Sequence, residues 1–156
     1  MLGRKIGRYR IVAKLGEGGM GTVWNAEDPL LHRTIALKFL PESMASSEEA
    51  RQRFLREARA ASALHHSGIA TVFDVGEVEN QIYIAMHMVD GETLSAKLAR
   101  GAMPVVEAVR IAVAAGEALE YAHAHGVLHR DISSRNIMVD RDGQVVVVDF
   151  GLALPE

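Results

Sequence analysis

Cysteine is absent from this chain of 156 residues. Its absence excludes disulfide bonds, and it excludes zinc and iron–sulfur sites that depend on thiolate ligands. A chain without cysteine is typical of a reducing compartment, so we expect a cytoplasmic location. Internal repeats and low-complexity linkers are also absent, so a repeat architecture is not expected.

Long apolar runs are missing as well. No segment approaches the roughly 20 apolar residues that a membrane-spanning helix requires, and the first ten residues lack the apolar core of a signal peptide. The 20 acidic and 17 basic residues are interspersed and give a formal net charge of −3. Without a basic stripe, nucleic acid is not an expected partner. The chain is 49% apolar and long enough to bury a core.

Alternating apolar and polar residues predict five strands in the first half of the chain. A glycine-rich turn, Gly16–Gly21, joins the first two strands into a hairpin, and Pro41 ends the third. An acidic turn at residues 77–80 joins the last two. The predicted strands are Tyr9–Leu15, Thr22–Ala26, Thr34–Leu40, Ile69–Val75 and Gln81–Met88.

One helix is expected between the third and fourth strands. Ser46 is a suitable N-cap, and Glu49 three residues later completes a capping box. Glu57 lies at the edge of the apolar stripe that this helix should bury. That stripe consists of Phe54, Ala58, Ala61 and Leu64.

The composition of the chain changes near Asp90, and we therefore expect two domains, residues 1–89 and 90–156. The second domain should begin with two helices, Thr93–Arg100 and Val105–His125. The long helix is rich in alanine, and the stripe that it should bury is Val109, Ala112, Val113, Gly116 and Leu119. Short strand pieces should follow at residues 127–128, 137–139 and 145–148.

The glycine-rich turn has the form G-x-G-x-x-G, with glycines at positions 16, 18 and 21 followed by Val23. Glycines let backbone amides approach phosphate oxygens without a Cβ in the way. Two other interpretations are a mobile hairpin tip and a dinucleotide-binding fingerprint. The fingerprint requires a helix after the turn, whereas residues 22–26 have a strand pattern, so we set it aside.

Lys38 interrupts the apolar strand Ile35–Leu40. An unpaired ammonium group in apolar surroundings is costly. Either Lys38 lies on an edge strand and extends outward to water, or it pairs with Glu57 and with phosphate oxygens. Glu57 taken alone is more typical of a surface acid on a helix.

Three further polar residues lie near the end of the chain. Asp131 and Asn136 are five residues apart on a segment without regular periodicity, a spacing that lets both reach one phosphate–metal site. Asp149 ends an apolar run, residues 145–148, where an acid is costly unless it meets a cation.

These residues, in this order, resemble the signatures of a protein kinase domain over residues 9–154. The signatures are the glycine-rich loop, Lys38 on the third strand, the H-R-D-x-x-x-x-N loop from His129 to Asn136, and Asp149-Phe150-Gly151. The glycine loop and residues 88–94 are most similar to bacterial serine/threonine kinases. The resemblance implies an α+β fold, with a five-stranded antiparallel N-lobe carrying one helix and a truncated, mainly helical C-lobe.

The resemblance also implies ATP and Mg²⁺ as cofactors and a role for individual residues. Asp131 would accept the proton of the substrate hydroxyl. Lys38, held by Glu57, would contact the α- and β-phosphates. Asn136 and Asp149 would bind magnesium. The remaining nucleotide contacts would come from Leu15, Gly16, Gly18, Gly21, Val23, Ala36, Met86, His87, Val89 and Met138.

The H-R-D loop departs from the serine/threonine kinase pattern. Ser133 stands where these kinases carry lysine, and Ser134 where they carry proline. Arg135, four residues after Asp131, resembles the tyrosine kinase arrangement and would place a positive charge near the γ-phosphate. We still expect serine/threonine specificity, because the rest of the chain resembles bacterial kinases.

The sequence stops five residues after Gly151, without an activation segment, an Ala-Pro-Glu motif or later helices. We therefore expect a fragment whose long helix leaves part of its apolar stripe uncovered. The expected function is ATP-dependent phosphoryl transfer to serine or threonine hydroxyls of a protein substrate, with little activity in the fragment alone. The alternatives are an ATP-binding pseudokinase or regulatory module, and a small-molecule phosphotransferase.

Overall fold

The computed structural model describes residues 1–18, 21–41 and 47–150, which form two compact units. Unit 1 contains Met1–Ser62 and Val72–Met88. Unit 2 contains Ala63–Thr71 and the described residues from Val89 onward. The segment Ala63–Thr71 thus belongs with the second half of the chain, although its neighbours in the sequence belong to unit 1. No helix in the described part is long and apolar enough to span a membrane.

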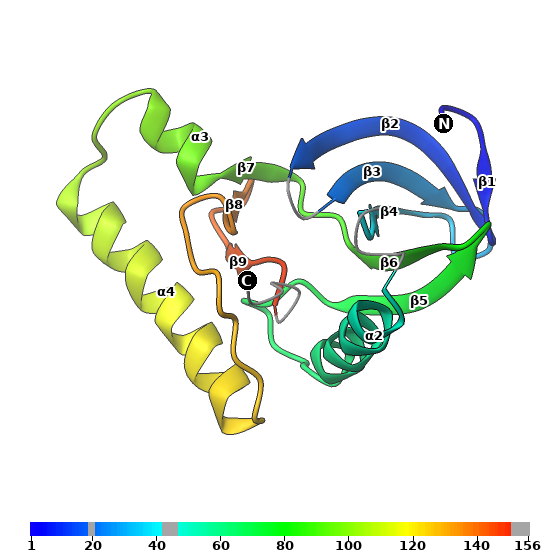
Figure 1. Ribbon diagram of the computed structural model, residues 1–156. Helices are drawn as coiled ribbons and strands as arrows, with labels where there is room; N and C mark the ends of the chain where they lie inside the picture. The colour runs from blue at the N-terminus through cyan, green and yellow to red at the C-terminus, as the bar shows by residue number, and fades with distance from the viewer. Residues whose placement is uncertain (19–20, 42–46, 151–156) are drawn as a thin grey trace. The chain divides into compact units, whose positions relative to one another are not determined.

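Unit 1 is built on a six-stranded antiparallel sheet with the strand order β1-β2-β3-β4-β6-β5 (Figure 1). All five predicted strands are present, with ends shifted by a few residues. The additional strand, β1, has only two residues, too few to show an alternating pattern. The strands are β1 Lys5–Ile6, β2 Tyr9–Gly18, β3 Gly21–Asp28, β4 Arg33–Phe39, β5 Val72–Val78 and β6 Gln81–His87.

The core of unit 1 lies on one face of this sheet. Directly paired residues share a face and successive residues alternate, so Leu37 and Phe39 of β4 point to the opposite face from Lys38. Tyr9 packs edge-on against Tyr83, with ring centroids 6.1 Å apart. The buried cluster consists of Ile6, Tyr9, Ile11, Ala26, Ile35, Leu37, Phe39, Tyr83 and Ala85.

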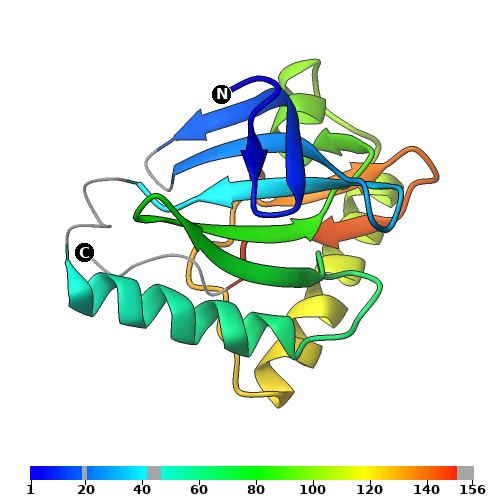
Figure 2. The same ribbon diagram turned by 90° about the vertical axis from the view of Figure 1, so that its right-hand side faces the viewer.

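Helix α2, Glu48–Ser62, runs along the sheet of unit 1 beside β5 (Figure 2). It buries Phe54, Ala58 and Ala61, as the apolar spacing predicted, and Leu64 beyond its end is buried too. The predicted cap, Ser46, lies outside the described residues. In the structure the Ser47 hydroxyl accepts a hydrogen bond from the Ala50 backbone N–H at 3.3 Å, so Ser47 caps the first turn.

Unit 2 contains two helices and a three-stranded antiparallel sheet, ordered β7-β8-β9. The expectation of a mainly helical second half was wrong, because α3 and α4 cover only 6 and 20 residues and the sheet lies beside them. Residues 127–128 are not in a strand. The elements are β7 Gly91–Thr93, α3 Leu94–Ala99, α4 Val105–Ala124, β8 Ile137–Asp140 and β9 Val145–Val147.

The long helix α4 buries a different face from the one that we predicted. Val109 and Val113, members of the predicted stripe, are each 55% exposed. The buried positions are Ile111, Ala115, Ala118 and Ala122. This face packs on β9, and its alanines let the helix approach the strand closely. Apolar periodicity could not decide between the two faces, because apolar residues lie on both: Ile111 and three alanines on one, and two valines, Ala112 and Leu119 on the other.

Backbone hydrogen bonds hold the segment Ala63–Thr71 within unit 2. The N–H of Ala70 donates to the Val147 carbonyl at 2.9 Å, and the N–H of Val147 donates to the Gly68 carbonyl at 2.8 Å. The Tyr121 hydroxyl of α4 accepts the N–H of His65 at 3.3 Å. These contacts attach the segment to both β9 and α4.

Substitution of glycine by alanine should change the free energy of unfolding in opposite directions at Gly91 and Gly116. A Cβ at Gly91 would lie 2.1 Å from the Val139 carbonyl oxygen, whereas a Cβ at Gly116 on α4 would meet nothing within 4 Å. Gly91→Ala should therefore lower the free energy of unfolding by about 1–3 kcal/mol, and Gly116→Ala should raise it by about 0.5–1 kcal/mol. Urea titration measures both; a Gly91→Ala protein as stable as the parent would contradict the strand packing.

Stability at high pH should depend on Tyr9. Its ring is fully buried, and its hydroxyl donates to Asp74 Oδ2 at 3.1 Å. Burial, together with the Asp74 carboxylate, raises the pKa of Tyr9 to about 12, above the ordinary value of about 10. The unfolded chain therefore loses this proton first, so the contribution of Tyr9 is complete below about pH 10 and is lost as the pH rises through about 12.

We expect this loss to reach about 2 kcal/mol, measured as the free energy of unfolding in urea at successive pH values. Tyr9→Phe should reduce the dependence on pH over that range. An equally steep dependence in Tyr9→Phe would assign the effect to other groups.

Candidate active site

Five of the predicted nucleotide-contact residues lie on one face of the sheet in unit 1. Gly16 of β2 is paired with Val23 of β3, and Val23 is paired with Lys38 of β4. Ala36, two residues before Lys38, is paired with Met86 of β6. Paired residues share a face, so the register brings these five positions together on the face opposite the aromatic core.

The glycine-rich turn joins the end of β2 to the start of β3. Gly18 and Gly21 form the last pair of the hairpin, and residues 19–20 lie outside the described part. Gly21 has a φ of +106°, and a Cβ there would lie 2.0 Å from the Phe39 carbonyl oxygen. The sheet itself therefore requires glycine at position 21. Gly16 has open space beside it, which leaves its backbone accessible.

Lys38 and Glu57 are both members of unit 1, on β4 and α2. Lys38 is only 2% exposed, which excludes the interpretation of a side chain extended into water. Its Nζ atom and the Oε2 atom of Glu57 are both buried from solvent. Burying an ammonium group is costly. The buried position of Lys38 on this face therefore favours a specific functional role for its side chain.

His129 holds the start of the H-R-D loop in unit 2. The side chain is 2% exposed, and its Nδ1 accepts the N–H of Asp131 at 3.2 Å. Its Nε2 therefore carries the proton that is donated to the Val148 carbonyl at 2.8 Å. The ring also packs edge-on against Phe150 at 4.8 Å. One buried imidazole thus ties the Asp131 segment to the Asp149 segment.

Asn136 makes the second connection between these segments. Its Nδ2 donates to the Asp131 carbonyl oxygen at 2.8 Å and to Asp131 Oδ2 at 3.1 Å. Its carbonyl accepts the N–H of Val148, the residue before Asp149, at 2.9 Å. Asp149 has a φ of 62°, a conformation that costs about 1–3 kcal/mol in a residue other than glycine. Hydrogen bonds therefore join Asp131, Asn136 and the residue before Asp149 in one network.

The donor atoms of this network fit magnesium bound together with a nucleotide. Asn136 uses its amide nitrogen on Asp131, which leaves its Oδ1 available as an oxygen ligand, and Asp149 offers a carboxylate. Among the described residues, no cluster of three or more His, Cys, Asp or Glu side chains could hold a metal by itself. Mg²⁺ takes one or two protein carboxylates and completes its shell with phosphate and water, so a small donor set is sufficient.

The departures in the H-R-D loop have a structural setting that sequence patterns did not reveal. The Ser134 carbonyl accepts the N–H of Ser95 at 2.8 Å, which ties the loop to the first turn of α3. Ser133 Oγ is buried and has no hydrogen-bond partner within the described ranges. Arg135 is exposed. Backbone groups such as the Ser95 N–H carry no residue-specific signal, so no motif could have identified this contact.

The remaining predicted nucleotide contacts are divided between the units. Leu15 and His87 are exposed residues of unit 1. Val89 and Met138 belong to unit 2, where Val89 is buried with Ala70 and Met138 packs against the same cluster. The residues of unit 1 and those of unit 2 are each well placed within their own unit. Their convergence on one nucleotide stays a prediction.

Comparison with known proteins agrees with this arrangement of motifs. The family model of the protein kinase domain matches residues 9–155. Serine/threonine-protein kinase PknE of Mycobacterium tuberculosis (strain ATCC 25618 / H37Rv) is 40% identical over 152 residues, covering 97% of this chain and 27% of that protein. PrkC of Bacillus subtilis (strain 168) is 40% identical over 155 residues, covering 98% of this chain and 24% of PrkC.

A solved structure has the same fold. The crystal structure of the Mycobacterium tuberculosis PknI kinase domain superimposes with a TM-score of 0.88 at 37% identity, covering 99% of this chain and 64% of that one. The chain therefore spans about a quarter of the length of these curated relatives and just under two thirds of the solved kinase domain.

Removing the Asn136 carboxamide should loosen unit 2. Asn136→Ala deletes two hydrogen bonds, one of them to a carboxylate, and should lower the free energy of unfolding by about 1–3 kcal/mol. Gln52→Ala is the matched control, because the Gln52 carboxamide donates to the Glu48 carboxylate at 2.8 Å on the exposed surface of α2. That change should cost at most about 0.5 kcal/mol. The free energy of unfolding is measured by urea titration. Equal losses in the two variants would show that the hydrogen bonds of Asn136 do not stabilise unit 2.

Proposed function

The chain belongs to the protein kinase domain family, and from that membership we propose that it carries the nucleotide-binding and catalytic residues of a serine/threonine protein kinase. The proposed reaction is transfer of the γ-phosphate of ATP to serine or threonine hydroxyls of a protein substrate. The observation that carries this proposal is the network in which Asn136 binds Asp131 and the backbone next to Asp149. Through its side chain and its backbone carbonyl, Asn136 links the segment of the proposed base to the segment of the second proposed magnesium ligand.

In unit 1, the proposed nucleotide site uses the sheet face that bears Lys38. The Lys38 ammonium group would bind the α- and β-phosphates, and the Glu57 carboxylate would hold it in position. Val23, Ala36 and Met86 would supply the apolar walls for the adenine. Further contacts are assigned to Leu15, Gly16, Gly18, Gly21 and His87 of unit 1 and to Val89 and Met138 of unit 2.

In unit 2, Asp131 is the proposed base. The hydrogen bond from Asn136 Nδ2 occupies Asp131 Oδ2, so Oδ1 is the oxygen left to accept the proton of the substrate hydroxyl. Asn136 and Asp149 would hold Mg²⁺, which when bound neutralises charge on the phosphates. Arg135 is assigned the positive charge near the γ-phosphate that lysine supplies elsewhere in the family, since Ser133 cannot carry it.

A second candidate follows from the H-R-D loop. Because Ser133 stands where serine/threonine kinases carry lysine, an ATP-binding module without phosphoryl transfer is the alternative. This alternative keeps the nucleotide site and lacks the transfer step. The two candidates agree on ATP binding and differ only in turnover, so both quantities need to be measured.

The test of the proposal changes one residue in each unit. Lys38→Ala and Asp149→Asn should each weaken Mg²⁺–ATP binding by about 10- to 100-fold, because each removes a charged contact worth about 1.5–3 kcal/mol. Asp142→Asn, in the exposed β8–β9 turn, is the matched control and should leave binding unchanged. Calorimetric titration gives the affinities; unchanged binding in either Lys38→Ala or Asp149→Asn would refute a site shared by both units.

Turnover is measured with ³²P-labelled ATP and a generic protein substrate. Asp131→Asn should lower transfer by about 10²- to 10⁴-fold while ATP affinity stays within about twofold. ATP binding without any transfer by the unmodified chain would favour the module without catalysis. Undiminished transfer by Asp131→Asn would exclude Asp131 as the base.

A further inference from the structure

Helix α4 carries an apolar seam outside the face that it buries against β9. Val105 and Val106 in its first turn are 78% and 82% exposed, and Val109 and Val113 further along are exposed too. Figure 1 shows α4 at the edge of unit 2, with β8 and β9 on one side of it. The α4 seam consists of Val105, Val109, Ala112, Gly116 and Leu119, at alternating intervals of four and three residues.

The spacing of the α4 seam is that of a helix that packs against another helix. Intervals of four and three repeat every seven residues, as in coiled coils. Ala112 and Gly116 are small and lie at the middle of the seam, so a second helix can approach closely there. Val109 and Leu119 flank them with larger side chains. Large apolar patches on a protein surface mark interaction sites, and this one fits a helix.

The charges beside the seam suit a second copy of α4 that runs in the opposite direction. Arg110 and Glu117 are exposed and lie on one edge of the helix. In an antiparallel pair with a two-fold axis beside Val113, Arg110 of each copy faces Glu117 of the other. A parallel, in-register pair would instead place like charges together.

Both members of this charged pair are available to a second copy. Arg110 Nη1 donates to the Gly143 carbonyl at 2.8 Å, which leaves Nη2 for a carboxylate. Glu117 forms no ion pair within the part of the chain that the structure describes. The edge of α4 therefore offers one cation and one anion at positions that a two-fold axis brings together.

The first turn of α4 supplies a second complementary charge. Its N-cap residue, Pro104, makes no side-chain hydrogen bond, so the first N–H groups lack a cap and the helix end is positive. Glu107, the acid in this turn, is paired with Lys97 at 3.0 Å. Glu120 follows Val113 by seven residues, as the first turn precedes it, and the antiparallel arrangement therefore places each Glu120 at the first turn of the other copy.

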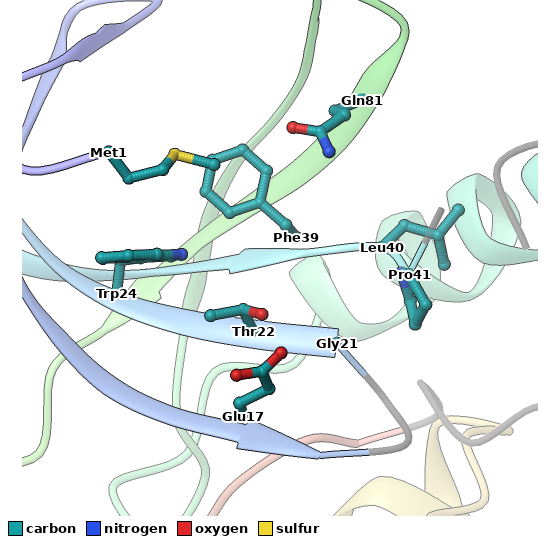
Figure 3. Close-up of a pocket in the computed structure, with 9 residues that line it drawn as sticks. All are labelled: Met1, Glu17, Gly21, Thr22, Trp24, Phe39, Leu40, Pro41 and Gln81. Atoms are coloured by element: carbon teal, nitrogen blue, oxygen red, sulfur yellow. The ribbon is translucent and has the colours of Figure 1, made fainter. Parts of the chain in front are cut away.

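The cavity on unit 1 could not pair with itself in this way. It has a volume of about 350 Å³, and Trp24, Phe39 and Gln81 are among the residues that line it (Figure 3). In a two-fold dimer each copy contributes the same patch, so two hollow surfaces would enclose a void and lose packing contacts. The outer surface of a helix with small residues at its middle has no such cost.

We propose that two copies of this chain associate through α4, antiparallel about a two-fold axis beside Val113. Val109 of each copy packs against Leu119 of the other, and Ala112 against Gly116. A single helix pair is small compared with the roughly 1,200–2,000 Å² of stable interfaces, so we expect a weak dimer with a Kd of about 1–100 µM. The interface contains no residue assigned to ATP or Mg²⁺ and is independent of the proposed function.

Charge exchange tests the pairing by sedimentation equilibrium. Arg110→Glu and Glu117→Arg each place like charges opposite one another and should raise the Kd at least tenfold. An equimolar mixture of the two variants restores opposite charges and should form dimers again. Arg59→Glu, at an exposed position of α2, is the matched control and should leave the Kd unchanged. Circular dichroism establishes that the variants are folded.

Cross-linking tests the direction of the helices, because the chain has no cysteine of its own. Val113→Cys places the two thiols beside the axis. Val106→Cys lies seven residues earlier in each copy, so its two thiols are about 21 Å apart along the helices at 1.5 Å per residue. A short bismaleimide should link Val113→Cys copies and leave Val106→Cys copies unlinked, although position 106 is the more exposed.

Four results would overturn the proposal. They are a parent chain that stays monomeric up to about 1 mM, an Arg110→Glu variant that dimerises like the parent, a mixture of the charge variants that fails to dimerise, and equal linking at the two cysteine positions. Loss of ATP binding with association intact would count against the proposed function alone.

Discussion

The proposed chemistry depends on the hydrogen bonds that Asn136 makes to the segments of Asp131 and Asp149. The side-chain Nδ2 donates to both the backbone and the side chain of Asp131, and the backbone carbonyl of Asn136 accepts the N–H of Val148, the residue before Asp149. His129 connects the same two segments from the buried side. An acidic residue at position 136 could not donate to Asp131, and an aliphatic residue could not bind a metal. The carboxamide donates through its nitrogen and keeps its oxygen for the proposed metal.

Sequence reasoning succeeded where a local pattern determines the structure. The five strands and the buried face of α2 around Phe54 follow from spacing alone. It failed where the buried face of an element depends on which other element of the same chain packs against it. The buried face of α4 is the alanine face because β9 lies against it, and the expected stripe with Val109 is exposed. The sheet of unit 2 was underestimated because its strands have three or four residues.

Strands β3 and β4 place side chains on both faces of the sheet in unit 1. One face carries Val23 and Lys38 at directly paired positions, and the other carries Thr22 and Phe39 at the next pair along the ladder. Because the side-chain period of a strand is two, a change of register by one residue would exchange these faces. Gly21 protects the register, since no side chain fits between its Cα and the Phe39 carbonyl. The same glycine therefore supports the proposed nucleotide face and the aromatic core on the other face.

The central claim is that residues of both units bind one nucleotide and its metal. Paramagnetic broadening by Mn²⁺ in place of Mg²⁺ tests it most directly, with backbone amide resonances followed by NMR in the presence and absence of ATP. The account predicts that Lys38 in unit 1 and Asn136 and Asp149 in unit 2 broaden together, and only when ATP is present. Broadening confined to one unit, or unchanged by ATP, would contradict it.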